Sequence, residues 1–393
     1  MRVRHAGVGE LILLWLGGIS LRITILAVPP LLPTIHRSLH LSESSVGALT
    51  NLPVLLLAVA AIPGSLLIAR IGARRALIAG LTLVAIAGAA RGIGGSEAVL
   101  FAMTFLMGVG IAVSQPALPS LVRLWFAHSP GLASAVYANG SLVGEIVAAS
   151  FTLPLVYPLL GRSWEAGLAF WSIPVFGAVL ALAVLTPHVP RTGELPAWWP
   201  AWRDGRLWAL GLTLGAASAA YFGSNAFLPD YLKSLNDGAV ITAALVSLSL
   251  SQLPSSFIVA AAPNRFIGKR WPVVVAGALT IAGAIGYGVW PEGVVAWAGI
   301  VGFSTAVIFV LVLALPPTIS SPENVHGLTS GIFTVSYVCP FVASVAGGSI
   351  WDATGISYTS FLPVIVCGIV IAGLSSGFEI PDAAALQNAP LSR

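Results

Sequence analysis

The amino-acid sequence predicts an all-α protein that crosses a membrane many times. Hydrophobic residues make up 57% of the 393-residue chain, and only 8% of its residues are charged. A soluble domain has about 25% charged residues, which form its polar surface. So few charges cannot cover a water-soluble protein of this length, whereas lipid can surround an apolar helix bundle directly. The apolar runs are continuous rather than alternating, which favours helices over a transmembrane β-barrel.

Twelve stretches are long and apolar enough to form membrane-spanning helices, each of which needs about 20 residues. Short polar connectors separate most of them. The frequent glycine, proline and tryptophan residues fit the same class, since all three are typical of membrane helices or their interfaces. We expect the helices at 10–35, 43–69, 74–93, 97–122, 131–157, 166–187, 206–232, 239–262, 271–290, 293–317, 326–350 and 357–378.

Arginine and lysine are distributed unequally between the two sides of the expected bundle. If the N-terminus is cytoplasmic, four basic residues fall on the outer side, namely Arg37, Arg91, Arg162 and Lys233. Positive residues favour the cytoplasmic side of membrane helices. We therefore expect both termini in the cytoplasm, in an inner membrane of the bacterial type. The inner side holds thirteen basic residues: Arg2, Arg4, Arg70, Arg74, Arg75, Arg123, Arg191, Arg203, Arg206, Arg265, Lys269, Arg270 and Arg393.

Two motifs recur at a nearly constant separation, which indicates an internal repeat. The pattern Leu-Pro, four residues, Ser-Leu begins at Leu32 and again at Leu228. A second pattern of arginine, glycine and further basic residues begins at Arg70 and again at Arg265. Two six-helix halves follow from this repeat, related by an axis along the membrane normal. Rocking of one half against the other could expose the seam between them to each side in turn.

The repeat sets the expected domain plan. We expect a first half at 1–187, a cytoplasmic linker at 188–205, a second half at 206–378 and a cytoplasmic tail at 379–393. Prolines make a continuous helix across the linker improbable. Its Trp198, Trp199 and Trp202 are typical of residues that anchor a chain at the membrane interface.

One basic residue, Arg22, lies near the middle of the first expected helix. Charged residues at this depth are costly and usually face a partner, a cavity or a ligand. Arg22 suits a small anion or a carboxylate, because its guanidinium is permanently charged and donates from a planar fork. Two interpretations stay open. Arg22 contacts an anionic substrate, or it pairs with Glu145.

Glu145 lies near the middle of the fifth expected helix, which runs in the same direction as the first, so its depth should match that of Arg22. A buried carboxylate can titrate near neutrality, and Glu145 is therefore a candidate for coupling transport to protons. The alternative is a plain counter-charge for Arg22. Gly140 and Gly144 precede it at the four-residue spacing that allows close helix packing.

Further polar residues lie in helices that would line the seam. A single one of them is more often an interhelical hydrogen bond than a ligand contact. As a set they are the candidate substrate-binding residues beside Arg22: Asn51, Gln115, Asn139, Tyr221, Asn225, Gln252 and Tyr337.

The repeated basic motif has two interpretations of its own. It could be a conformational latch that holds one state through contacts to helix ends, or it could only mark the cytoplasmic side. The latch candidates are Arg70, Gly72, Arg74, Arg75, Arg265, Gly268, Lys269 and Arg270.

The sequence contains no pattern for a cofactor, a metal or an enzymatic reaction. All six histidines map to loops or helix ends, and no metal-ligand or nucleophile motif occurs. Cys339 and Cys367 lie in apolar segments as small hydrophobic residues. The net charge of +4 is spread over helix ends, so no nucleic-acid partner is expected. We expect a monomer whose partners are lipid, a small solute and, in one interpretation, protons.

The chain resembles the major facilitator superfamily, and within it the cyanate-transporter and 2-nitroimidazole-transporter branch. The stretches that carry the resemblance are SLRITILAVPPLLPTI (20–35), LSESSVGALTNLPVL (41–55), GVGIAVSQPALPSLV (108–122), AYFGSNAFLP (ending at Pro229) and WDATG (351–355), together with Arg91. Ser20 stands where this branch has asparagine, and Ala69 and Asn264 stand where the superfamily's loop motif has an acidic residue. Glu145 replaces a small or apolar residue.

The resemblance implies a secondary transporter of a cyanate-like or small organic anion, with Arg22 as the anion contact. An alternative within transport is an exporter of nitroimidazoles or other drug-like compounds. The alternative from another class is a membrane sensor or receptor, which would need a signalling domain or a long tail.

Overall fold

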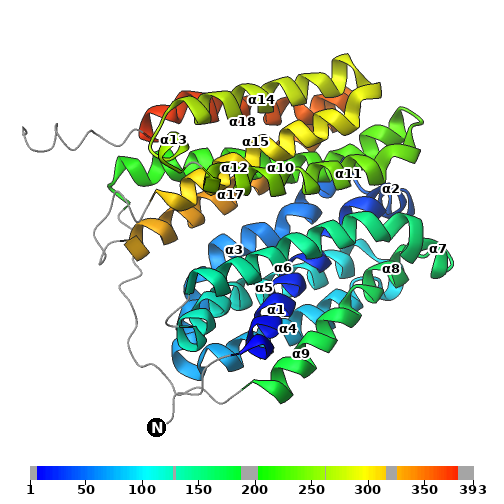
Figure 1. Cartoon of the computed structure of the whole chain (residues 1–393). Coiled ribbons are helices and arrows are strands. Elements are labelled where there is room, and N and C mark those ends of the chain that lie inside the picture. Colours follow the sequence, from blue (N-terminus) through cyan, green and yellow to red (C-terminus); the bar gives the residue numbers. More distant parts are fainter. Residues whose placement is uncertain (1–6, 127–129, 187–201, 262, 316–324, 379–393) are drawn as a thin grey trace, which may run out of the picture.

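The computed structural model describes residues 7–126, 130–186, 202–261, 263–315 and 325–378, and it is helical without a strand over these residues (Figure 1). Ten helical spans in the described part of the chain are long and apolar enough to cross a membrane. The expected α-helical membrane fold is confirmed. The tail and most of the linker, including Trp198 and Trp199, lie outside the described residues.

Five of these spans and the helix Glu43–Ile71 make up the first half. A break at Ala27 divides the first of them, where Pro29 and Pro30 start a new helix because proline is tolerated in a first turn. The elements are α1 (Val8–Leu26), α2 (Val28–Leu39), α3 (Glu43–Ile71), α4 (Ala73–Ala90), α5 (Glu97–Trp125), α6 (Pro130–Phe151), the π-helical η2 (Thr152–Val156), α7 (Tyr157–Leu159), α8 (Trp164–Phe170) and α9 (Ser172–Leu185).

The second half repeats this plan. Its first helix, α10 (Gly205–Ser234), is less apolar than the others but is buried along most of its length. The remaining elements are α11 (Ile241–Leu250), α12 (Gln252–Ala261), α13 (Pro263–Phe266), α14 (Trp271–Val289), α15 (Val294–Ala314), α17 (Val325–Thr354), η5 (Ser357–Phe361), α18 (Leu362–Gly373) and η6 (Leu374–Phe378). The expected span boundaries differ from these by at most four residues.

The backbone carries the same internal repeat as the sequence. Positive φ angles end the corresponding helices at His40 (51°) and Asn236 (61°), which are 196 positions apart. The same separation relates Gly72 (86°) and Gly268 (74°) in the basic motif. Glycine suits these two turns because it has no Cβ atom to oppose a positive φ.

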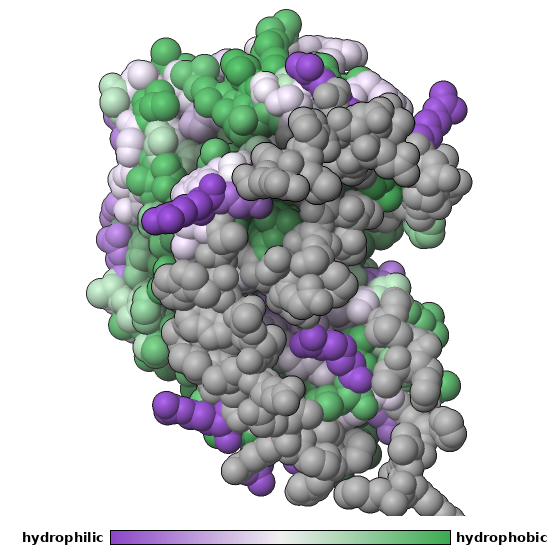
Figure 2. Space-filling view, turned by 90° about the vertical axis from the view of Figure 1, so that its left-hand side faces the viewer, coloured by the Kyte–Doolittle hydropathy of each residue, from purple (hydrophilic) through white to green (hydrophobic). Residues whose placement is uncertain are grey.

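The two halves lie closest at one end of the molecule. α2 contacts α10 and α11 there, and α3 packs along α17 (Figure 1). Apolar residues of both halves form one core at this end, including Leu32, Ile35, Leu228 and Leu232. Toward the opposite end, at which α1 begins, the helices of the two halves lie farther apart (Figure 1). Figure 2 looks onto that end and shows a notch between an upper and a lower part, with hydrophobic side chains on the flanks.

Close packing of α1 against α6 sets the register of the first half. A Cβ atom on Gly144 would lie 2.7 Å from the carbonyl oxygen of Ile19, and one on Gly140 would collide with the carbonyl oxygen of Trp15. The two helices can approach this closely only because glycine has no side chain. They run parallel, and this register carries the first-half charges toward each other.

Candidate functional site

Arg22 and Glu145 form an ion pair near the middle of their spans, Val8–Leu39 and Leu132–Leu159. The Nε atom of Arg22 lies 3.6 Å from Oε1 of Glu145, and the side chains are 17% and 6% exposed. The predicted equality of depth is therefore observed, and the pairing interpretation describes this state. A pair at this depth spares each charge the cost of burial alone.

The second carboxylate oxygen of Glu145 connects the two halves. Its Oε2 accepts a hydrogen bond of 2.9 Å from the Tyr221 hydroxyl on α10. The Gln252 amide on α12 donates to the same oxygen over 3.3 Å. The Tyr221 hydroxyl also lies 3.2 Å from the Ser249 hydroxyl. The Glu145 side chain thus has one cation and two hydrogen-bond donors as partners.

The terminal nitrogens of Arg22 are left available. Among the described residues, the only ion pair or hydrogen bond of its side chain runs through Nε. The guanidinium lies 5.9 Å from the ring centroid of Phe222, within the range of a cation–π contact. Glu145 and Phe222 thus hold one edge and one face of the guanidinium, and its two terminal NH2 groups can meet a ligand.

Two more predicted residues lie near this group. Tyr337 on α17 packs against both hydrophobic clusters of the molecule and lies near Arg22. It stacks on Phe333 with ring centroids 5.6 Å apart. Asn225 lies one turn beyond Tyr221 and donates to its backbone carbonyl. Sequence reasoning missed Phe222 and Ser249, because neither residue type stands out within an apolar segment.

The remaining predicted residues do not contact Arg22 or Glu145. The Asn51 amide donates to the Ser344 hydroxyl over 2.8 Å and so joins α3 to α17. Asn139 is exposed and accepts from the Trp15 indole over 3.0 Å. Gln115 is half-buried and makes no hydrogen bond within the described part of the chain. Asn51 and Asn139 therefore serve helix packing in this state.

The basic motifs make contacts inside each half. Arg74 donates to the carbonyl of Ala183 at the end of α9 over 2.7 Å. The corresponding residue of the second half, Arg270, donates to the Ser375 hydroxyl in η6 over 2.9 Å. Each thus connects the third span of its half to the sixth. Their neighbours Arg70, Arg75, Arg265 and Lys269 are exposed and have no ion pair among the described residues. A latch across the halves stays a prediction.

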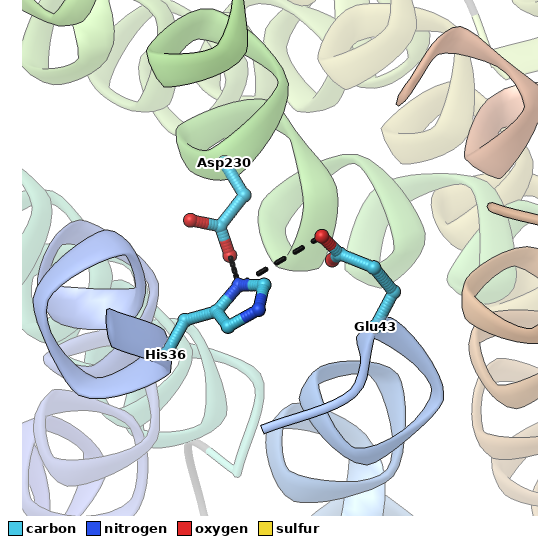
Figure 3. A group of neighbouring side chains, drawn as sticks. All are labelled: His36, Glu43 and Asp230. Atoms are coloured by element: carbon cyan, nitrogen blue, oxygen red, sulfur yellow. Dashed lines mark hydrogen bonds and ion pairs between the residues drawn. The ribbon is translucent and has the colours of Figure 1, made fainter. Parts of the chain in front are cut away.

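Sequence reasoning missed a second charged cluster. It lies at the end of the molecule at which the two halves are closest, which we call the closed end. His36 on α2 lies between Glu43 of α3 and Asp230 of α10 (Figure 3). Nearby, Asp352 on α17 accepts from the backbone N–H groups of Glu43 and Ser44 and from the Ser44 hydroxyl. His36 does stand in the last turn of its helix, as expected, but its partners are far away in sequence.

A cavity of about 280 Å³ opens between the halves at the same end. Its lining includes Arg37 and Lys233, which occupy equivalent positions of the internal repeat, and also Thr34 and Tyr157. Two cations beside a cavity create a positive potential that favours the approach of anions.

Curated relatives match most of the length of the chain. An uncharacterized transporter of Bacillus subtilis, YycB, is 26% identical over 364 residues, which cover 90% of this chain and 89% of the relative. The cyanate transport protein CynX of Escherichia coli is 26% identical over 313 residues, covering 78% and 80%. The 2-nitroimidazole transporter of Escherichia coli is 24% identical over 372 residues, covering 91% and 92%.

The fold is also that of solved transporters. A bacterial homolog of the human lysosomal transporter Spinster, in an inward-facing and unoccupied conformation, superimposes with a TM-score of 0.71 at 15% identity, covering 94% of this chain and 96% of the homolog. The sequence profile of the Major Facilitator Superfamily matches residues 14–261. This multi-pass chain therefore belongs to the Major Facilitator Superfamily and is a transporter, not an enzyme.

Proposed function

We propose that this transporter moves a small anion by alternating access and that Arg22 is the anion contact. One observation carries the proposal. At mid-span, where the two halves meet, a permanently charged guanidinium is held through one nitrogen, and its two terminal NH2 groups have no hydrogen-bond or ion-pair partner among the described residues. Planar donors of this kind match a carboxylate or a small planar anion. The relative named as a cyanate transport protein supports the same substrate class.

Glu145 would compete with the substrate in such a site. Both are anions and both are drawn to Arg22, so an arriving anion weakens the pair of Arg22 and Glu145. A proton on Glu145 has the same effect, because a neutral carboxyl no longer attracts the guanidinium. Uptake of an anion together with a proton is therefore the coupling that this pair favours.

Tyr221 and Gln252 would link substrate binding to movement of the halves. Both belong to the second half, and both donate to the Glu145 carboxylate of the first half. Since protonation or displacement of Glu145 weakens these bonds, it would also loosen the seam at mid-membrane. The same event then prepares the site and releases the contact that holds the halves together.

The test is ligand-dependent thermal stability of the purified protein. Ligands stabilise the folded state by mass action. Cyanate, formate and nitrate are titrated at constant ionic strength against chloride. We expect a rise in melting temperature with at least one planar anion, its loss in Arg22→Gln, and a weaker rise in Arg22→Lys, which keeps the charge but not the fork. An unchanged response of Arg22→Gln would remove Arg22 as the contact.

The exposed Arg206 provides the matched control, since it begins α10 far from the pair and forms no ion pair among the described residues. Arg206→Gln removes the same charge and should respond like the wild type. If Arg206→Gln and Arg22→Gln lose the anion-induced rise in melting temperature equally, the cause is a general effect of net charge.

A second candidate substrate is a neutral nitroaromatic compound. Phe222 lies against the Arg22 guanidinium, and Tyr337, which stacks on Phe333, lies nearby on α17. One relative is named as a 2-nitroimidazole transporter. Stabilisation by 2-nitroimidazole that survives in Arg22→Gln, without any anion effect in the wild type, would favour this substrate.

The orientation in the membrane belongs to the same proposal. We infer an inner membrane of the bacterial type with both termini in the cytoplasm, from the excess of arginine at the connectors on that side. The closed end, with His36 and the cavity beside Arg37, is then the outer end. Both termini should be cleaved by protease in inside-out vesicles and protected in intact spheroplasts.

A further inference from the structure

We propose that His36, Glu43 and Asp230 form a binding site for a transition-metal ion such as Zn²⁺, which joins the two halves at the closed end. The three residues come from α2, α3 and α10, so two belong to the first half and one to the second (Figure 3). None of them contacts Arg22 or Glu145. The site is separate from the proposed substrate site.

The distances between the ligand atoms suit zinc. Nδ1 of His36 lies 3.2 Å from Oδ2 of Asp230 and 3.7 Å from Oε1 of Glu43, and all three atoms lie within 4.8 Å of one another. Zinc bonds to histidine nitrogen and carboxylate oxygen place tetrahedral ligands about 3.3 to 3.6 Å apart. These two separations bracket that range, so only small side-chain rotations are needed for these two pairs of atoms. A water molecule would supply the fourth ligand.

The charge of the cluster calls for a cation. Glu43 and Asp230 are only 8% and 7% exposed. The Oε2 atom of Glu43 is buried and has no hydrogen-bond partner among the described residues. Asp352 adds negative charge beside the cluster, but its oxygens already accept three hydrogen bonds. A divalent ion between the two buried carboxyl groups would supply the partner that Oε2 of Glu43 lacks.

The mixture of ligands selects among metals. An imidazole nitrogen favours Zn²⁺, Ni²⁺ and Cu²⁺, whereas Ca²⁺ and Mg²⁺ prefer a cage of oxygen ligands. Three side chains that leave one position to water agree with zinc rather than with the six to eight ligands of calcium. The His36 side chain is 28% exposed, so an ion can reach it from the solvent.

Bound metal would hold the protein in the state described here. Asp230 can share an ion with His36 and Glu43 only while the two halves meet at this end. A ligand that binds one conformation shifts the population toward it. This consequence rests on the proposed alternating access, whereas metal binding itself does not.

Binding is tested with tag-free protein, because a histidine tag would itself bind zinc. ZnCl₂ is titrated by calorimetry and by thermal shift at pH 7.5, with MgCl₂ and CaCl₂ for comparison and EDTA for reversal. We expect a zinc-specific rise in melting temperature. His36→Gln should weaken the apparent affinity at least about tenfold, since it replaces a metal ligand.

Two further variants keep the result interpretable. His40→Asn changes an exposed histidine of the same connector that ends α2 with a positive φ, which asparagine tolerates. It should bind zinc like the wild type. Asp230→Asn should weaken binding as His36→Gln does, because the site spans both halves. Unchanged zinc affinity in Asp230→Asn would overturn the proposal. So would equal losses of zinc affinity in His36→Gln and His40→Asn.

The conformational part has its own measurement. Cys339 and Cys367 are first replaced by alanine. Spin labels are then attached to the cysteines of Glu97→Cys and Glu292→Cys, one exposed position in each half, and the distance between the two labels is measured. Zinc should narrow the distance distribution to a single short population, and His36→Gln should remove this effect. A zinc-independent distribution would overturn the trapping while leaving the binding result to stand on its own.

A pure proton-sensing role of the cluster gives a different pattern. Stability would then change with pH in the range in which histidine titrates, and zinc would have no effect on the wild type at any pH. That outcome would also overturn the metal site.

Discussion

At the scale of residues, the central feature of the site at mid-membrane is one ion pair. Within the described part of the chain, Arg22 pairs with one carboxylate, Glu145, which also accepts hydrogen bonds from Tyr221 and Gln252. The contact is long, at 3.6 Å, and involves only Nε of Arg22. The guanidinium therefore does not make the two parallel hydrogen bonds that it can form with a carboxylate. The pair is therefore suited to exchange of partners rather than to a permanent structural bridge.

Glu145→Gln is the residue-scale prediction. The amide keeps the shape of the side chain and an acceptor for the Tyr221 hydroxyl, but it no longer competes for Arg22. We expect anion affinity to rise on the order of tenfold, since a bond to a charged group is worth roughly 1.5 kcal/mol or more. The melting temperature without ligand should fall, because Arg22 loses its counter-charge.

Titration of the same planar anions against Glu145→Gln and wild-type protein measures this effect. Weaker anion binding in Glu145→Gln would contradict the competition and favour Glu145 as part of the substrate contact. Failure to obtain folded Glu145→Gln would favour an ion pair that is structural.

At the scale of elements, the site is built by the parallel packing of α1 and α6. Gly140 and Gly144 let the two backbones approach, and this register brings Arg22 opposite Glu145. The break at Ala27 allows α2 to turn toward α10 beyond that contact, and this places His36 beside Asp230. One glycine pair and one proline pair thus position both charged clusters.

Gly144→Ala tests the role of this packing. Its Cβ atom would lie 2.7 Å from the backbone oxygen of Ile19, so α1 and α6 must move apart. Overpacking of this kind costs about 1–3 kcal/mol. We expect a melting temperature several degrees lower and weaker anion binding, because Arg22 and Glu145 separate.

Gly177→Ala in α9 is the matched control, since a Cβ atom there has no heavy atom within 4 Å. Alanine is favoured over glycine in a helix by about 1 kcal/mol, so this variant should be neutral or slightly stabilised. If Gly144→Ala and Gly177→Ala lower the melting temperature and weaken anion binding equally, close packing of α1 against α6 is not the reason for the effect.

At the scale of the whole molecule, contacts between the halves gather at one end. Asp352 of the second half caps the start of α3 through the backbone N–H groups of Glu43 and Ser44. A carboxylate at a helix N-terminus is favoured by free N–H groups and by the helix dipole. Such a cap is made only while the halves are together, so it stabilises the state closed at this end.

Asp352→Asn should weaken that closure. A cysteine in place of the buried Ser344, in protein whose Cys339 and Cys367 are alanine, reports opening by its rate of reaction with a maleimide. We expect labelling to become several times faster in Asp352→Asn, because a neutral amide accepts fewer and weaker bonds. The exposed Glu97→Gln serves as the control for lost charge. An unchanged rate would show that Asp352 does not stabilise the closed end.

The sequence alone determined the properties that depend on local composition and spacing. Apolar runs of about 20 residues defined the spans, because lipid requires every backbone group to bond within a helix. The motif that begins at Leu32 recurs at Leu228 and revealed the repeat. Position along two helices was enough to expect Arg22 and Glu145 at the same depth, with their pairing as one of two interpretations. These properties need no knowledge of how the halves meet.

Only the tertiary structure decided which polar groups share a site. Tyr221 and Gln252 reach Glu145, whereas Asn51 and Asn139 serve helix packing. His36 and Asp230 lie 194 positions apart in the chain and form one cluster. Such contacts depend on the rotation of each helix and on the way the halves close. Neither is encoded in the spacing of residues along a single span, because each follows from packing against partners far away in sequence.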